Sequence, residues 1–439
     1  MKDDAKGSCP DQKGAREFLR KATDSGAPTS AGSEPPPHTP VQTDSAFAEK
    51  GAAAVAGLSA FFAMVICLDS ATNPEPDPTE VSRNALRDHV ASVIDACCRE
   101  QNGIWGLLEA DLFACILPHL TPAAGKAMAE AIRDAVAQRQ NGTVSIGTAV
   151  FPQGEFQKDE IIDNALKALD HAAFFGPGAV AAFDAVSLNI SGDKHYQAGD
   201  ISSAIEEFQR ALALDPKDYN VQNSLGVCYG VLGAYEKALK IFEAAMILAP
   251  DDTMAIYNAG LTHVCMGDRD RALDLFLQAA KTQGAPYEVG LQAGRIYLDM
   301  KEPTQAHPFL EIASESQPES GIAHRYLGEC LAALDRVEPA VAAYKKAVRF
   351  NPHDAEALSA MGCLFDRMGE NPEISTLFCR QSIELAPENG LFRQRLGDLL
   401  LKQNRLEEAL EHFFAAEERG IDVRDLIAET RERLTLEAS

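Results

Sequence analysis

Two aspartates of this sequence follow segments that should form strands, and their carboxylates could together bind a divalent metal. Asp69 ends the apolar run FFAMVICLD, and Asp111 lies in residues 107–117, which are expected to form a hairpin. Mg²⁺ and Ca²⁺ prefer oxygen ligands of this kind. Carboxylates at strand ends are more often simply hydrated, so the pair alone predicts at most weak metal binding.

The cysteines and histidines do not have the spacing of a structural zinc site. The sequence has ten cysteines, and no two of them form a C-x-x-C pair. His263 and Cys265 are two residues apart, which on a helix points them to different faces. We therefore expect buried thiols in a reducing cytosol, and hence a cytoplasmic protein.

Other catalytic motifs are absent from the sequence. It contains no G-x-x-x-x-G-K-[ST] loop, no G-x-G-x-x-G turn and no G-x-S-x-G nucleophile elbow. The sequence therefore predicts no catalytic residue, no cofactor and no metal ligand, and we expect that the protein is not an enzyme.

Composition narrows the class of partner. The 439 residues carry a formal net charge of −25, which repels nucleic acid and anionic membrane surfaces.

Residues 1–45 are rich in Gly, Ser, Thr and Pro and are expected to be disordered. Residues 51–68 are uncharged, but their first half is mostly Ala and Gly, so a helix followed by a buried strand is favoured over a membrane span.

Glycine recurs with a period of 34 or 35 residues in the C-terminal part of the sequence. The seven positions are Gly192, Gly226, Gly260, Gly294, Gly328, Gly362 and Gly397. A small residue and then a large apolar one follow each glycine at fixed spacing, except that the sixth repeat has Ser375 and Cys379 there. Small residues let two antiparallel helices approach closely, and the large residue fills the space between them.

This pattern resembles the tetratricopeptide repeat, a pair of antiparallel helices, over residues 185–421. The resemblance implies an α-solenoid of seven repeats. They are expected to begin near Ala185, Tyr219, Thr253, Tyr287, Gly321, Ala355 and Gly390. In residues 422–439, apolar side chains from Val423 to Leu434 recur at helical spacing, which predicts a capping helix that covers the end of the stack.

The first helices of such a solenoid line a concave groove that binds a peptide or a protein. The candidate groove residues are Asn223, Tyr257, Asn258, Arg295 and Arg325. Family members that bind a peptide carboxylate use Lys, Arg and Asn on successive repeats, and the lysines of that set are absent here. Carboxylate capture is therefore a weaker hypothesis than a general peptide groove, and at any single position a hydrated helix face is the simpler interpretation.

Residues 46–184 alternate between strand and helix patterns, which predicts an α/β sandwich. The segments TVSIGTAVFP (143–152) and ALKALDHAAFFGPGAVAAFD (165–184) resemble the last part of a GGDEF domain, the fold of bacterial diguanylate cyclases. The strand expected before residue 184 leads directly into the first repeat. We therefore expect a fixed orientation between the two modules.

The residues that carry the chemistry of the GGDEF family are lost. Its Gly-Gly-Asp-Glu-Phe signature falls on residues 109–113, where only Asp111 and Phe113 are retained. The metal-binding glutamate corresponds to Leu112, and the phosphate-contacting lysine of the last helix corresponds to Ala173. The resemblance therefore implies a degenerate GGDEF-like domain without cyclase activity.

The sequence thus predicts a non-enzymatic scaffold or adaptor of bacterial signalling, whose repeats bind a partner protein or peptide. It predicts neither nucleic-acid nor membrane binding. The alternative is a nucleotide receptor, in which the inactive cyclase domain binds GTP or cyclic di-GMP and thereby regulates the groove of the repeats.

Overall fold

The computed structural model describes residues 45–69, 80–109, 111–138, 142–282, 284 and 286–437. The predicted disorder of residues 1–45 therefore falls, apart from Ser45, outside the described residues, as does Ala110 of the hairpin. The chain divides into two compact units, Met1–Pro250 and Asp251–Ser439, which are described separately.

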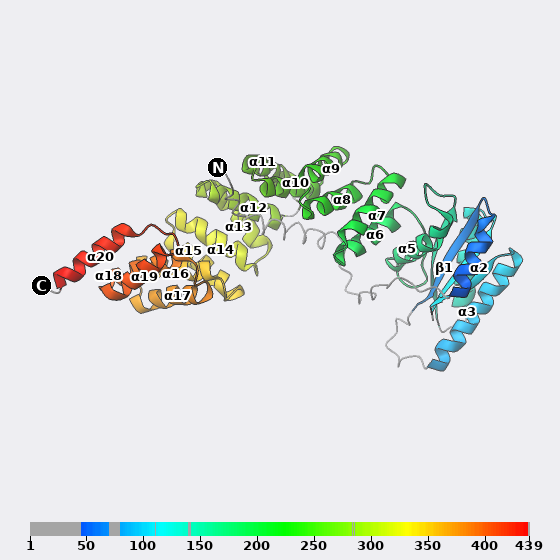
Figure 1. Ribbon diagram of the computed structural model, residues 1–439, viewed down its shortest axis with the longest axis horizontal. Helices are drawn as coiled ribbons and strands as arrows, with labels where there is room; N and C mark the ends of the chain where they lie inside the picture. The colour runs from blue at the N-terminus through cyan, green and yellow to red at the C-terminus, as the bar shows by residue number, and fades with distance from the viewer. Residues whose placement is uncertain are drawn as a thin grey trace, which may run out of the picture. The chain divides into compact units, whose positions relative to one another are not determined.

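A five-stranded sheet in the order β2-β3-β1-β4-β5 forms the core of the N-terminal part of the first unit (Figure 1). The strands are β1 (Phe61–Leu68), β2 (Ile104–Glu109), β3 (Leu112–Pro118), β4 (Val144–Phe151) and β5 (Val180–Ala182). β1 runs antiparallel to both of its neighbours, β3 and β4, and β2 and β3 form the predicted hairpin. The apolar run that ends before Asp69 is thus the central strand of the sheet.

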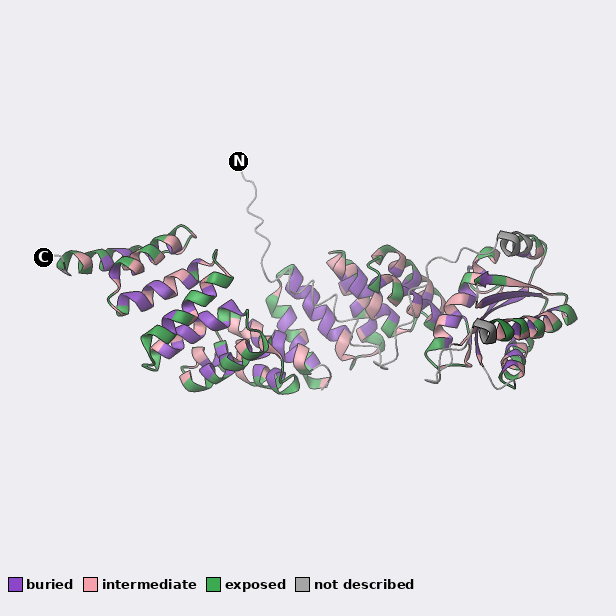
Figure 2. Ribbon diagram, turned by 90° about the horizontal axis from the view of Figure 1, so that it is seen from below, coloured by how far each residue is buried: buried purple, intermediate pink, exposed green. Residues whose placement is uncertain are grey.

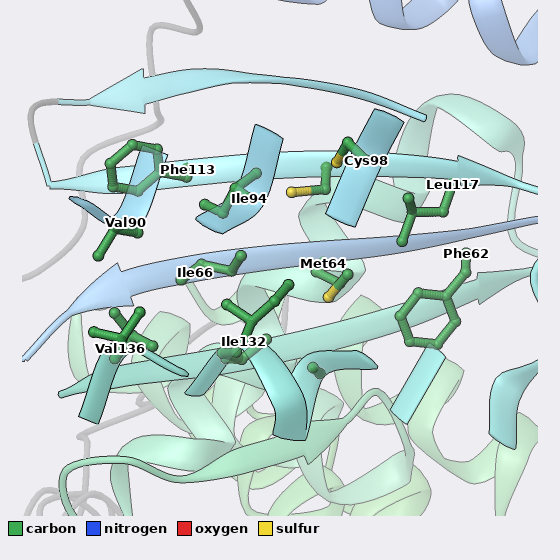
Figure 3. Packing of buried hydrophobic residues seen from close by; sticks show 14 residues of the cluster. Phe62, Met64, Ile66, Val90, Ile94, Cys98, Phe113, Leu117, Ile132 and Val136 are labelled. Carbon is green, nitrogen blue, oxygen red and sulfur yellow. The ribbon is translucent and has the colours of Figure 1, made fainter. Parts of the chain in front are cut away.

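Helices cover both faces of this sheet. They are α2 (Ser45–Ala56), α3 (Glu80–Glu100), α4 (Pro122–Ala137) and α5 (Ile161–Ala173). Figure 3 shows one face, where Val90 and Ile94 of α3 and Ile132 of α4 pack on Met64 and Ile66 of β1. On the other face α5 lies on β1 and β4. The order β1-α3-β2-β3-α4-β4 is a split β-α-β arrangement.

Helix α2 precedes β1, as the pattern of residues 51–68 predicts. Among the residues that the structure describes, no helix is both long and apolar enough to cross a membrane.

Among the described residues, seven antiparallel helix pairs follow the sheet at the predicted positions, and the single helix α20 follows the last pair. The first unit contains α6 (Ala185–Gln197), α7 (Ile201–Leu214), α8 (Tyr219–Val231) and α9 (Tyr235–Leu248). The second contains α10 (Thr253–Met266), α11 (Arg269–Ala279), α12 (Pro286–Asp299), α13 (Pro303–Ser316), α14 (Gly321–Ala333), α15 (Val337–Phe350), α16 (Ala355–Arg367), α17 (Pro372–Leu385), α18 (Gly390–Lys402), α19 (Leu406–Glu417) and α20 (Arg424–Glu437). Within each unit, Figure 2 shows buried residues where paired helices face one another.

Local sequence sets the helix boundaries. Many first helices begin after an Asp, Ser or Asn whose side chain accepts a hydrogen bond from a backbone N–H of the first turn, as Asp218 and Asp354 do. A residue with positive φ follows each first helix. These residues are Gly199, Gly233, Gly267, Lys301, Asp335, Gly369 and Asn404. Such a residue allows the sharp turn into the second helix of the pair.

The seven recurring glycines, which we call the framework glycines, mark close approaches between the two helices of a pair. They are Gly192, Gly226, Gly260, Gly294, Gly328, Gly362 and Gly397. A Cβ atom on Gly192 would lie 2.5 Å from the ring of Phe208, and one on Gly226 would lie 2.5 Å from the ring of Phe242. In the sixth repeat, the neighbour of Gly362 is Cys379 Sγ, also at 2.5 Å. The predicted packing of glycine against the large residue is therefore confirmed.

The predicted capping helix is also present, as α20. Val423, Ile427 and Thr430 are buried, and Leu426 and Leu434 pack against the cluster that α18 and α19 form. Helix α20 thus covers the apolar end of the last repeat.

Candidate functional site

The carboxylate of Asp69, at the end of β1, is held by three hydrogen bonds. The hydroxyl groups of Thr143 and Ser145 donate to it at 2.7 and 2.6 Å, and the backbone N–H of Gly178 donates at 2.7 Å. These donors come from β4, the residue before it and the loop before β5. Asp69 therefore links the end of β1 to the start of β4 and to the loop before β5, at one end of the sheet.

The second candidate carboxylate, Asp111, forms an ion pair. Arg87 Nε of α3 lies 2.6 Å from Asp111 Oδ1. The residue after it, Leu112, is buried in β3 and brings no ligand atom. Among the described residues there is no group of three or more His, Cys, Asp or Glu side chains that could hold a metal ion. Both carboxylates thus have partners within the protein.

We expect Asp69→Asn to lower the free energy of unfolding by about 1–3 kcal/mol, because an amide would replace a charged acceptor of three donors. Urea unfolding followed by the fluorescence of Trp105, the single tryptophan, measures this in the sheet. Asp88→Asn on the exposed face of α3 is the matched control and should change little. Mg²⁺ should leave the unfolding midpoint unchanged. A midpoint raised by Mg²⁺ would contradict the assignment of both carboxylates to contacts within the protein.

The sheet and the first repeat share a packed junction within the first unit. Helix α5 contacts both β4 and α6, and only Phe183 and Asp184 separate β5 from α6. Lys167 Nζ of α5 lies 2.7 Å from Glu207 Oε1 of α7, and both side chains are largely buried. Helix α5 therefore belongs to the core of the sheet and also covers the end of the repeat helices.

Aromatic and polar contacts complete this junction. The rings of Phe156 and Phe183 meet edge to face at 5.1 Å, and the guanidinium of Arg210 lies 4.4 Å from the centre of the Phe156 ring. Arg210 also pairs with Glu160. The expectation of a direct connection without a flexible linker agrees with these contacts.

In the second unit, the first helices of successive repeats lie side by side. Helix α12 contacts α14, α14 contacts α16, and α16 contacts α18. Their exposed sides form what we call the inner wall. Its central positions are the residues that immediately follow the framework glycines, namely Arg295, Glu329, Cys363 and Asp398. All four reach solvent.

Polar contacts join neighbouring repeats along the inner wall. Arg325 Nε lies 3.3 Å from Asp354 Oδ2, and the guanidinium of Arg325 stacks on Tyr326 at 4.3 Å. One repeat further on, Arg395 Nη1 of α18 donates to Ser359 Oγ of α16 at 3.0 Å. The wall thus presents two arginines whose positions are fixed by contacts with a neighbouring repeat, the following one for Arg325 and the preceding one for Arg395.

The structure separates the five candidate groove residues. Asn223 lies on α8 of the first unit, and the other four lie in the second. Tyr257 and Asn258 do not project as expected, since they are 1% and 0% exposed. Tyr257 packs against Phe276 at 5.6 Å, and burial raises the pKa of its hydroxyl. Arg295 and Arg325 remain on the surface of the inner wall.

Arg395, Cys363 and Asp398 also lie on the inner wall, but they are not among the candidate groove residues predicted from the sequence. A signal was available, because Cys363 and Asp398 follow framework glycines as Arg295 and Glu329 do. The same position in the first repeat is Asp193, on α6. Burial raises the pKa of the Asp193 carboxyl to about 6.

Asp193→Asn should stabilise the protein at neutral pH. The folded state binds the Asp193 proton more tightly than the unfolded state does, so the carboxyl lowers stability as the pH rises from about 4 to 6. We expect a gain of about 1–2 kcal/mol at pH 7, allowing for partial exposure, and almost none at pH 4. Urea unfolding at both values measures it, with the exposed Asp274→Asn as control. Equal effects at both pH values would contradict this assignment.

A sequence model of the tetratricopeptide repeat family matches residues 191–253 and 291–355. The matched segments lie outside residues 46–184, so the resemblance of those residues to a GGDEF domain stays a prediction. No curated protein matches the sequence.

Several solved structures resemble the chain. YrrB, a tetratricopeptide-repeat protein with an unusual peptide-binding site, is 21% identical with a TM-score of 0.40, over 43% of this chain and 96% of YrrB. PilF of Pseudomonas aeruginosa is 18% identical with a TM-score of 0.43, over 46% and 92%. A tetratricopeptide-repeat protein of Parabacteroides merdae is 17% identical with a TM-score of 0.40, over 56% and 96%. On the match to the family model, the C-terminal region of this chain contains tetratricopeptide repeats.

Proposed function

We propose that this protein is a non-enzymatic scaffold whose inner wall binds an extended or helical peptide segment of a partner protein. The observation that carries this proposal is the column of residues after the framework glycines. Arg295, Glu329, Cys363 and Asp398 lie on helices α12, α14, α16 and α18, and each differs from its neighbours in charge or polarity. A packing role would favour similar residues at equivalent positions, whereas a varied column suits recognition of a particular sequence.

The contacts within the inner wall also support its role in binding a peptide. Arg325 and Arg395 are each held by a residue of another repeat, Asp354 or Ser359, so a ligand would not have to order these long side chains. Side chains that are already ordered lose less conformational entropy on binding. The overall acidity of the chain favours a basic or neutral partner over an acidic one.

We further propose that the sheet and its helices, residues 46–184, which we call the sheet module, are a GGDEF-like domain that has lost its chemistry. We propose that this module serves in bacterial signalling as a cap and docking element. Asp69 and Asp111, the two carboxylates that could together have bound a metal, are both used in contacts within the fold. This use supports a structural role for the module rather than a nucleotide site.

The test is peptide selection on the full-length protein. Peptides displayed on phage are selected for binding, and the affinity of an enriched peptide is measured by fluorescence anisotropy. We expect Arg295→Ala and Glu329→Ala each to weaken binding at least about fivefold, as truncations at the centre of an interface do. The matched controls Arg349→Ala and Glu338→Ala, on exposed sites of the second helix α15, should leave it unchanged. Equal affinity in all four variants would refute the proposal.

A further inference from the structure

The sixth repeat contains two cysteines, and peptide binding at the inner wall does not explain why they occur as a pair. Cys363 lies on α16, and Cys379 lies on α17, where the other repeats carry Phe, Leu or Tyr. A Cβ atom on Gly362 would lie 2.5 Å from Cys379 Sγ and 2.7 Å from the carbonyl oxygen of Ser375. Cys379 Sγ therefore lies against the backbone of α16, beside the residue that precedes Cys363.

The two thiols differ in their surroundings. Cys379 is fully buried, and its Sγ lies 3.7 Å from the carbonyl oxygen of Ser359. Cys363 reaches solvent on the inner wall. Accessible cysteines that react with peroxides often lie next to a second cysteine, which resolves the oxidised product.

Neighbouring groups favour the thiolate of Cys363. A hydrogen bond from the Cys379 thiol lowers the pKa of Cys363 to about 7, burial opposes this shift, and the charge of Arg395 supports it. Asp398 of α18 and Asp366 of α16 oppose it as well. Arg395 is positioned by its hydrogen bond to Ser359, one helical turn before Cys363. The thiolate is the form of cysteine that attacks a peroxide.

We propose that Cys363 and Cys379 form a reversible disulfide when the protein reacts with a peroxide. The Cys363 thiolate attacks one oxygen of hydrogen peroxide, the O–O bond breaks, and the departing hydroxide takes up a proton to give water. Cys363 is then a sulfenic acid. Cys379 Sγ attacks Cys363 Sγ, the S–O bond breaks, and a second water leaves with the thiol proton. The two thiols lose two electrons, and the peroxide is reduced to two waters.

The test uses the full-length protein and hydrogen peroxide. Treated protein is alkylated and cut with trypsin, which places Cys363 in residues 350–367 and Cys379 in residues 368–380. We expect a linked pair of these peptides that a reducing agent separates. In Cys379→Ser, dimedone should instead trap a sulfenic acid at Cys363. Cys98 and Cys115, both buried in the sheet module, are the internal control and should stay reduced.

A second measurement leaves both cysteines in place. The rate of alkylation of Cys363 by iodoacetamide should rise with a midpoint near pH 7. Arg395→Gln should move this midpoint upward and Arg395→Lys should restore it, whereas Arg433→Gln, whose side chain pairs with Glu429 on α20, should not move it. A midpoint at the ordinary thiol value, or oxidation of other cysteines without the linked peptides, would overturn the proposal.

Discussion

Gly147→Ala is expected to destabilise the sheet module by about 3–4 kcal/mol. A Cβ atom on this residue of β4 would lie 2.0 Å from the carbonyl oxygen of Ala165 and 2.2 Å from the backbone nitrogen of Leu169, both in α5. Overpacking usually costs about 1–3 kcal/mol, because side chains can shift. Here the obstacle is backbone, so α5 as a whole must move away from the sheet.

Two probes separate this effect from a general loss of structure. Trp105 lies in β2, so its fluorescence follows the sheet, whereas far-UV circular dichroism is dominated by the repeat helices. The fluorescence transition should move to lower urea concentration. Gly57→Ala is the control in the same module, since its added Cβ would meet no atom within 4 Å. An unchanged fluorescence midpoint in Gly147→Ala would contradict the close packing of α5 on β4.

Lys167→Met should weaken the junction between the sheet and the first repeat by about 2–3 kcal/mol. The Lys167 and Glu207 side chains are 18% and 10% exposed, so the substitution leaves a carboxylate without its cation in a mostly buried place. Breaking a fully buried pair from one side costs about 3–5 kcal/mol, and partial exposure reduces this figure. We expect the sheet, followed by the fluorescence of Trp105, and the helices that unfold first, followed by far-UV circular dichroism, to have separate urea transitions.

The double variant Lys167→Met with Glu207→Met distinguishes charge from packing. It removes both charges at once, so it should recover most of the stability that the single variant loses. Lys194→Met is the matched control across the same junction. Its partner Asp170 is 2.7 Å away, but the lysine is 42% exposed, so its loss should cost under about 1 kcal/mol. A single variant as stable as the natural chain would show that the junction is not coupled through this pair.

Much of the fold follows from the sequence because its patterns are local. The glycine period places every helix pair, since each glycine is needed for the close approach to Phe208, Phe242 or their equivalents. The central strand and the hairpin are also predicted, because a run of β-branched and aromatic residues between turns has few other solutions.

The candidate site is predicted less well, because it depends on contacts between distant segments. Tyr257 is expected on the wall, yet it is buried because the neighbouring helices α11 and α12 surround it. The three donors to Asp69 come from residues 74 to 109 positions away in the chain. The pairing of Cys363 with Cys379 likewise depends on how α16 packs on α17.

Hydrogen–deuterium exchange of the full-length protein, with and without a selected peptide, tests whether the inner wall is the binding surface. We expect slower exchange on binding in the first helices α12, α14, α16 and α18, with smaller changes in the second helices α13, α15 and α17 between them. Protection confined to the second helices or to the sheet module, residues 46–184, would contradict peptide binding at the inner wall.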